Sequence, residues 1–304
     1  PPMRLNADFS KPVVIRPEDY EWRNSPSAGV QRMMLDRVGG EIARATSLVR
    51  FGPNASFAEH THGGGEEFFV LEGAFGDEHE IYPAGSYVRN PVGTSHSPRV
   101  GPDGCLILVK LYQMDDDDQE QIAVDTSSGT WQPAKDPGVE VLYLHEYGEE
   151  RVALMRYAPD TRVASHRHPG GQEAFVISGT FGDEFGEYAA GTWVRNPPGI
   201  VHATYSGSEG ALIYLKLGHL APSSTRFASR STLVLYLRLS FSSVCLPSCR
   251  KYSPLRCGRI DVTRCRFTMA DRWTRTNISG SSTSSRCFIV PRKTYVSPAA
   301  CTHM

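Results

Sequence analysis

The sequence predicts an all-β protein of two tandem double-stranded β-helix barrels of the jelly-roll type, followed by a disordered C-terminal tail. An internal duplication indicates the two barrels, because the segment His60-Thr61-His62 recurs as His166-Arg167-His168 at a distance of 106 residues. A repeat of about 100 residues has the size of a complete domain. Within each copy, short runs rich in β-branched and aromatic residues alternate with Gly and Pro turns, and long helical stripes are missing. This pattern is typical of antiparallel double-sheet barrels.

The elements expected in the first copy include strands over residues 67–71, 86–89 and 105–112, and their counterparts in the second are 174–177, 192–195 and 211–217. Upstream of these strands, Trp22 and Gly29 recur 109 residues later rather than 106. The second copy therefore lacks three residues, which we place in the turn near Gly39. We expect the first domain over residues 6–113 and the second over residues 126–220.

Residues 114–125 join the two domains and contain the acidic run Asp115 to Asp118. A calcium-binding loop needs a defined spacing of oxygen ligands and a Gly, and this segment has neither. We therefore predict a solvated acidic linker.

The tail, residues 221–304, differs in composition from the rest of the chain. It has no Glu, 14 Lys and Arg against two Asp, and six of the seven cysteines. The cysteine spacings fit no common zinc template, and a basic arm for nucleic acid is the other alternative. We expect a disordered or non-native segment.

The remaining residues carry 18 Lys and Arg against 31 Asp and Glu, a balance of −13, which argues against nucleic acid as their partner. A single cysteine, Cys105, suits a reducing compartment. We find no secretory signal and no apolar stretch of membrane-spanning length. We therefore expect a soluble cytoplasmic protein that binds a small molecule and no membrane, and leave a homodimer open.

Candidate metal ligands lie at the core of the first repeat. His60 and His62 are two apart on an expected strand, so both side chains face the same side. A Gly-rich turn follows and returns Glu66 beside them, while Glu67 faces the other way. After the turn at residues 91–93, His96 can supply a third imidazole. Three imidazoles and one carboxylate suit Zn²⁺, Fe²⁺, Mn²⁺, Ni²⁺ or Cu²⁺, and we take Zn²⁺ first with Fe²⁺ or Mn²⁺ as alternatives.

The second repeat retains the three imidazoles but changes the acid. Its candidate ligands are His166, His168, Gln172 and His202. Glu173 stands on the opposite strand face unless a β-bulge turns it inward. A neutral amide in place of a carboxylate predicts weaker binding of a dication, so the two sites are expected to differ in occupancy and role.

These residues resemble the cupin superfamily, with Gly73 after the first ligands and Gly85, Pro91 and Gly93 ahead of His96. More narrowly, the segments HTHGGGEEFFVLEGAFGDE and YPAGSYVRNPVGTSHSP are similar to the cupin domain of ChrR-type anti-sigma factors, once per half over residues 20–220. The resemblance implies a bicupin and assigns the eight candidate ligands named above to two metal sites, with Gln172 departing from the pattern. ChrR-type anti-sigma factors bind their sigma factor through a separate helical, zinc-binding N-terminal domain. Only some twenty residues, without Cys, precede the first repeat, so we do not expect sigma-factor binding.

Three functions follow as hypotheses. The first is a metal-binding regulatory or sensory module that binds a small molecule without turnover. The second, which related stand-alone cupins suggest, is a non-haem Fe(II)-dependent dioxygenase acting on a diketone or hydroxy-ketone. The third is a structural metal that only stabilises the barrel. No residue is assigned a catalytic role, and Phe68, Val70, Tyr87 and Val88 are expected to line a pocket or to pack in the core.

Overall fold

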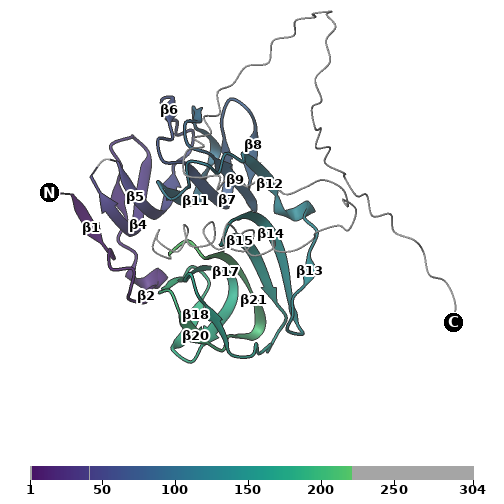
Figure 1. Ribbon diagram of the computed structural model, residues 1–304. Helices are drawn as coiled ribbons and strands as arrows, with labels where there is room; N and C mark the ends of the chain where they lie inside the picture. Colours follow the sequence, from purple (N-terminus) through teal and green to yellow (C-terminus); the bar gives the residue numbers. More distant parts are fainter. Residues whose placement is uncertain (1, 41, 221–304) are drawn as a thin grey trace, which may run out of the picture. The chain divides into compact units, whose positions relative to one another are not determined.

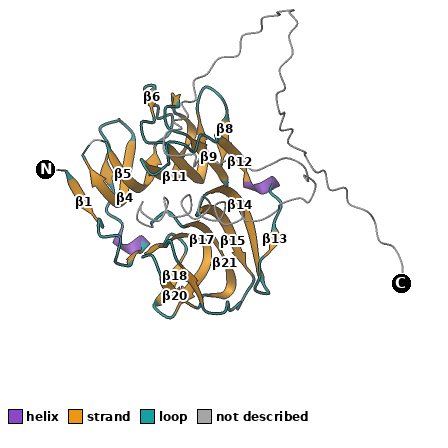
Figure 2. Ribbon diagram, viewed as in Figure 1, coloured by secondary structure: helices purple, strands orange, loops and turns teal. Residues whose placement is uncertain are grey.

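A computed structural model describes residues 2–40 and 42–220, and the expectations for residues 221–304 lie outside this described part. The described chain is almost entirely β-structure, with two short 3-10 helices, η1 (Pro17–Asp19) and η2 (Thr126–Ser128) (Figure 2). The all-β prediction with two barrels is confirmed. No helix among the described residues is long and apolar enough to cross a membrane.

The first barrel is built on an antiparallel nine-stranded sheet (Figure 1). Its main path is β1 (Met3–Leu5), β4 (Val30–Gly39), β5 (Ala43–Phe51), β11 (Arg99–Leu111), β7 (Glu66–Gly76), β9 (Ser86–Asn90) and β12 (Ile122–Asp125). β3 (Arg23–Asn24) pairs with β4, β8 (Ile81–Pro83) pairs with β7, and β6 (His60–Thr61) forms a separate ribbon with β10 (Ser95–His96). The pairing of β11 with β7 contains two register shifts, of the kind that β-bulges produce and that bend a strand.

The second barrel repeats this plan with an eight-stranded sheet. Its path is β13 (Gln132–Pro133), β14 (Val139–Tyr147), β15 (Glu150–Tyr157), β21 (Tyr205–Leu217), β17 (Gln172–Asp183), β19 (Trp193–Asn196) and β2 (Val13–Ile15). β18 (Gly186–Ala189) pairs with β17, and β16 (His166–His168) pairs with β20 (Ile200–His202). The β14–β15 hairpin is the shorter one, which confirms the predicted place of the deletion.

The two barrels exchange strands. β2 lies between β1 and β3 of the first barrel in the sequence but pairs with β19 of the second barrel, where Val14 lies opposite Val194. β12 precedes the second barrel but pairs with β9 of the first, where Ala123 lies opposite Val88. The two crossing strands occupy equivalent positions of the repeat, so the exchange is reciprocal and each sheet is completed by the other half of the chain.

Strand alternation separates three hydrophobic clusters. Inward residues fill each barrel: Phe68 and Val70 belong to the first core, and Val176 belongs to the second. The opposite faces pack the barrels against each other around a third cluster, which includes Phe69 and Trp193. Each such fully buried large apolar side chain stabilises the fold by roughly 1.5–3 kcal/mol.

The interface between the barrels also buries ion pairs. Glu67 contacts Lys216, and Glu173 contacts Lys110, with all four side chains nearly inaccessible to solvent. Lys216 also lies 2.8 Å from Glu150. Burial by itself would raise the pKa of Glu67, but Lys216 and Lys110 outweigh it and lower that pKa to about 2. The charges are therefore retained inside the protein because they compensate one another.

The prediction of a solvated linker is wrong at two places. Asp118 is 4 % exposed and lies 2.6 Å from Arg89 and 2.8 Å from His145. Residues Ile122–Asp125 form β12 and complete the first sheet. A buried Arg89 guanidinium needs an anion, and this requirement, which the local composition does not reveal, draws Asp118 inward.

Candidate metal centres

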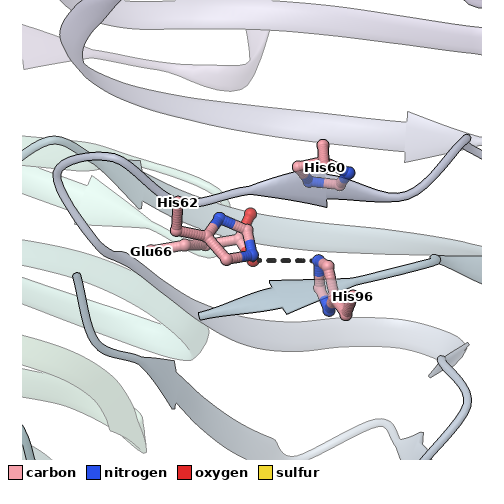
Figure 3. A group of neighbouring side chains, drawn as sticks. All are labelled: His60, His62, Glu66 and His96. Atoms are coloured by element: carbon pink, nitrogen blue, oxygen red, sulfur yellow. Dashed lines mark ion pairs between the residues drawn. The ribbon is translucent and has the colours of Figure 1, made fainter. Parts of the chain in front are cut away.

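The first centre gathers four side chains from three chain segments (Figure 3). His60 lies on β6 and His96 on β10, and the two residues are direct cross-strand partners. His62 follows β6, and the turn that separates it from Glu66 closes with a hydrogen bond from Gly65 N–H to the His62 carbonyl. Gly65 has a φ of 73°, which glycine adopts without steric cost. Glu66 then begins β7.

Distances within the cluster fit a common ion. One ligand atom from each of the four residues can be chosen so that all lie within 4.8 Å of one another. Glu66 Oε2 is 3.5 Å from His62 Nε2 and 3.4 Å from His96 Nε2. Two ligand atoms that are each about 2.1 Å from a tetrahedral ion lie about 3.4 Å apart. The spacing therefore matches the edge of a metal coordination shell.

Two of these nitrogen atoms lack a partner in the described structure. Nε2 of His62 and Nε2 of His96 are buried and make no hydrogen bond. Leaving a buried polar atom unsatisfied costs about 1–3 kcal/mol. A cation between the imidazoles and the carboxylate would satisfy both atoms at once, so the residues present fit a divalent metal.

Outer contacts orient the imidazoles. His96 Nδ1 lies 3.3 Å from Asp77 Oδ2, and His60 Nδ1 lies 3.1 Å from the Ala58 carbonyl oxygen. Asp77 in turn accepts hydrogen bonds from the backbone N–H groups of His79 and Glu80. A proton held on Nδ1 leaves the Nε2 lone pair directed at the centre, which is the tautomer that binds metal.

Electrostatics of the first centre follow from its burial. Burial, with smaller effects from His96 and His60, lowers the pKa of His62 to about 3. Burial, opposed by a hydrogen bond from Asn90 and aided by Asp77, raises the pKa of Glu66 to about 7. Without a cation, the centre therefore favours neutral imidazole and resists a carboxylate charge.

The second centre repeats the three imidazoles. His166, His168 and His202 come together, with 3.1 Å between Nε2 of His168 and Nε2 of His202. His202 Nδ1 lies 2.9 Å from Asp183 Oδ2, which parallels the 3.3 Å contact between His96 Nδ1 and Asp77 Oδ2. Burial, followed by His202 and His166, lowers the pKa of His168 to about 3.

Gln172 begins β17 at the position that Glu66 has on β7, and it is buried. Its Oε1 accepts a hydrogen bond from Asn196 Nδ2 at 3.3 Å, which parallels the 3.3 Å contact between Asn90 and Glu66. Glu173 does not turn inward, because it contacts Lys110 and lies 3.0 Å from His219. The alternative of a bulge that brings Glu173 to the centre is therefore wrong.

The amino-acid sequence matches the family described as the ChrR cupin-like domain twice, over residues 10–115 and 119–221. The chain belongs to the ChrR cupin-like family. The two matches lie on the two barrels, so this cupin is a tandem one, as the resemblance implied. No protein of curated function matches it.

Solved structures share the cupin architecture at low sequence identity. A candidate dioxygenase from Nostoc punctiforme is 17% identical, with a TM-score of 0.58 over 70% of this chain and 85% of that one. Ylba from Escherichia coli is 15% identical, with a TM-score of 0.55 over 69% of this chain and 92% of that one. An oxalate decarboxylase from Bacillus subtilis is 13% identical, with a TM-score of 0.50 over 72% and 83%. At these identities the likeness shows the fold alone.

Sequence reasoning missed the two carboxylates that orient imidazoles of the centres, Asp77 beside His96 and Asp183 beside His202. Both occur in a Gly-Asp-Glu segment that recurs in the two repeats, and this recurrence was the available signal. The four residues expected to line a pocket or to pack in the core do the latter. Phe68, Val70 and Val88 pack inside the first barrel. Tyr87 faces the other barrel, and its hydroxyl donates a hydrogen bond to Glu67 at 2.9 Å.

Proposed function

We propose that the first centre holds a divalent metal through His60, His62, Glu66 and His96, and that the protein binds a small molecule there in a regulatory or sensory role. The observation that carries this proposal is the pair of buried, unpartnered Nε2 atoms facing the Glu66 carboxylate. A bound dication supplies a Lewis acid that attracts an oxygen donor.

The surroundings of the centre favour a small ligand. His60 is the most exposed of the four residues, while His62 and His96 are 4 % and 3 % exposed. Behind them Phe68 and Val70 fill the barrel. A ligand therefore reaches the metal from the His60 side and meets a packed apolar wall beyond it.

Zn²⁺ is the first choice of metal, with Fe²⁺ or Mn²⁺ as alternatives, because imidazole and carboxylate ligands suit all three. We further propose that His166, His168, Gln172 and His202 hold a second ion less tightly. Gln172 contributes an amide oxygen, which lacks the negative charge that Glu66 gives to the first centre.

Metal analysis of the purified full chain, grown with Zn, Fe and Mn supplied, tests both proposals. The His62→Ala variant is expected to lose about one metal equivalent per chain, and His168→Ala less than one. His79→Ala is the matched control, because His79 lies on an exposed hairpin with 62 % of its side chain accessible. Unchanged metal content in His62→Ala, or equal losses in the two site variants, would contradict the assignment.

The open side at His60 supports a second candidate, a non-haem Fe(II)-dependent dioxygenase acting on a diketone or hydroxy-ketone. In that case the chain's residues would orient the substrate beside the metal, and the packed wall would exclude water. Oxygen uptake by iron-loaded protein with a 1,3-diketone separates the candidates. Substrate-dependent uptake that is lost in His62→Ala favours the enzyme, and its absence favours the binding module.

A further inference from the structure

The second barrel contains a cavity of about 310 Å³ on its inner face. Its apolar wall includes Leu215 and Leu217 of β21 and Met155 of β15. All three belong to the inward-facing residues that surround the second core. The cavity is therefore an opening into the barrel rather than a groove on its outside.

Strand register places this cavity beside the second centre. Gln172 is the direct cross-strand partner of Leu217, and Leu217 is the partner of Arg151 on β15. Arg151 also lines the cavity. Since neighbouring strands lie about 4.8 Å apart, the backbone of Arg151 is about 10 Å from that of Gln172. A molecule of a few carbon atoms spans this distance.

Charge in the cavity is all of one sign. Arg151 and Lys135 are among its lining residues, and no Asp or Glu is. Within the described chain Arg151 contacts Glu146, whose Oε1 accepts from Nε at 2.8 Å. A guanidinium has five N–H donors, so this contact leaves donors for a ligand. Tyr143, which is 52 % exposed, also lines the cavity.

The first barrel does not repeat this arrangement. The partner of Leu111, the counterpart of Leu217, is Ala45 in the place of Arg151. Phe68 stands where the second barrel has Ala174, two residues beyond the Glu66 or Gln172 position on the same strand face. The second barrel therefore has a small residue where the first has a bulky core residue, and it has a cation at the rim where the first has Ala45.

We propose that the second barrel binds a small organic carboxylate, with its apolar body against Leu215, Leu217 and Met155 and its carboxylate paired with Arg151. The positive lining complements the anion, and the neutral Gln172 adds no repulsive charge. An arginine is suited to this role because its planar fork matches a carboxylate. The site is separate from the small-molecule site proposed at the first centre.

Calorimetric titration of the metal-replete full chain with hexanoate tests the proposal, with 1-hexanol and hexylammonium as probes of equal length. Hexanoate is expected to bind in the wild type at least about tenfold more tightly than either neutral or cationic probe, because charge-assisted hydrogen bonds exceed neutral ones. The Arg151→Gln variant is expected to lose about tenfold in hexanoate affinity for the same reason. Hexanol binding as tight as hexanoate would overturn the proposal.

Arg156→Gln is the matched control, since Arg156 lies on the same strand in an exposed ion pair with Glu140 but on the outer face. Equal losses in the two arginine variants would reduce the effect to general surface charge. Ala153→Leu fills the cavity without changing its charge and is expected to abolish hexanoate binding, while unchanged binding would place the anion elsewhere. His62→Ala is expected to bind hexanoate like the wild type, so that failure of the first-centre proposal remains distinguishable from failure of this one.

Discussion

Replacing Glu66 by Gln gives the first centre the ligand set of the second, and the structure predicts opposite effects on stability and on metal binding. The pKa of Glu66 rises from an ordinary 4.5 to about 7 because the carboxyl is buried. Above pH 7 the folded, metal-free protein must carry a charge that the unfolded chain carries at no cost. Below pH 4.5 both states hold the proton and the penalty disappears. Because one pH unit corresponds to about 1.4 kcal/mol, the charge costs the metal-free fold about 3 kcal/mol above pH 7.

Glu66→Gln removes this cost, so the metal-free variant is expected to be about 3 kcal/mol more stable than the wild type at pH 8 and equally stable near pH 4.5. Metal affinity should fall in the same variant, because the carboxylate charge is lost. Urea unfolding in the presence of a chelator at both pH values, together with chelator competition for the metal, measures the two effects. The reverse change, Gln172→Glu, is the control and should weaken the metal-free fold while tightening the second centre. A metal-free Glu66→Gln protein less stable than the wild type at pH 8 would refute the reasoning.

Three further predictions concern the surroundings of the centres. Asp77→Asn should weaken metal binding at the first centre by about 10- to 100-fold, as chelator competition would show, because the carboxylate orients His96. The metal-free Glu66→Gln variant, which lacks the opposing titration of Glu66, should lose stability as pH falls from about 6.5 towards 3. The reason is that the unfolded chain takes up protons on His62 and His168, whereas in the folded chain both pKa values are lowered to about 3. A melting temperature of this variant that stays constant from pH 7 to pH 5 would contradict the prediction. Lys216→Met should destabilise the fold by about 3–5 kcal/mol by leaving Glu67 buried without a cation, and a Lys216→Met, Glu67→Gln double variant should recover part of the loss in urea unfolding.

Much of the site was predictable because a strand alternates with a period of two. Counting along residues 66–70 assigns Glu66 to the inner face with Phe68 and Glu67 to the outer face with Phe69, and the structure has both as expected. Duplication strengthened the inference, because a spacing that recurs after 106 residues is far less frequent by chance than one His-X-His. The three-residue deletion could also be placed, since only a turn tolerates it without shifting strand register.

The contacts between the barrels could not be predicted in this way. β2 and β12 are three and four residues long, and such runs do not indicate which of two similar sheets they join. Asp118 lies in an acidic run whose composition predicts exposure to solvent, and its burial is explained by its ion pair with Arg89 on β9. Long-range pairing of this kind depends on the assembled fold, which local residue patterns do not encode.

The reciprocal exchange of β2 and β12 resembles that of a two-fold symmetric, strand-swapped dimer, but here both halves belong to one polypeptide. Because both copies lie in one polypeptide, each always has its partner in a one-to-one ratio, and the two copies can differ in sequence. One half can then carry Gln172 and Ala174 at the positions where the other carries Glu66 and Phe68. A pair of identical chains has no such freedom, since every change in its gene appears on both sides at once.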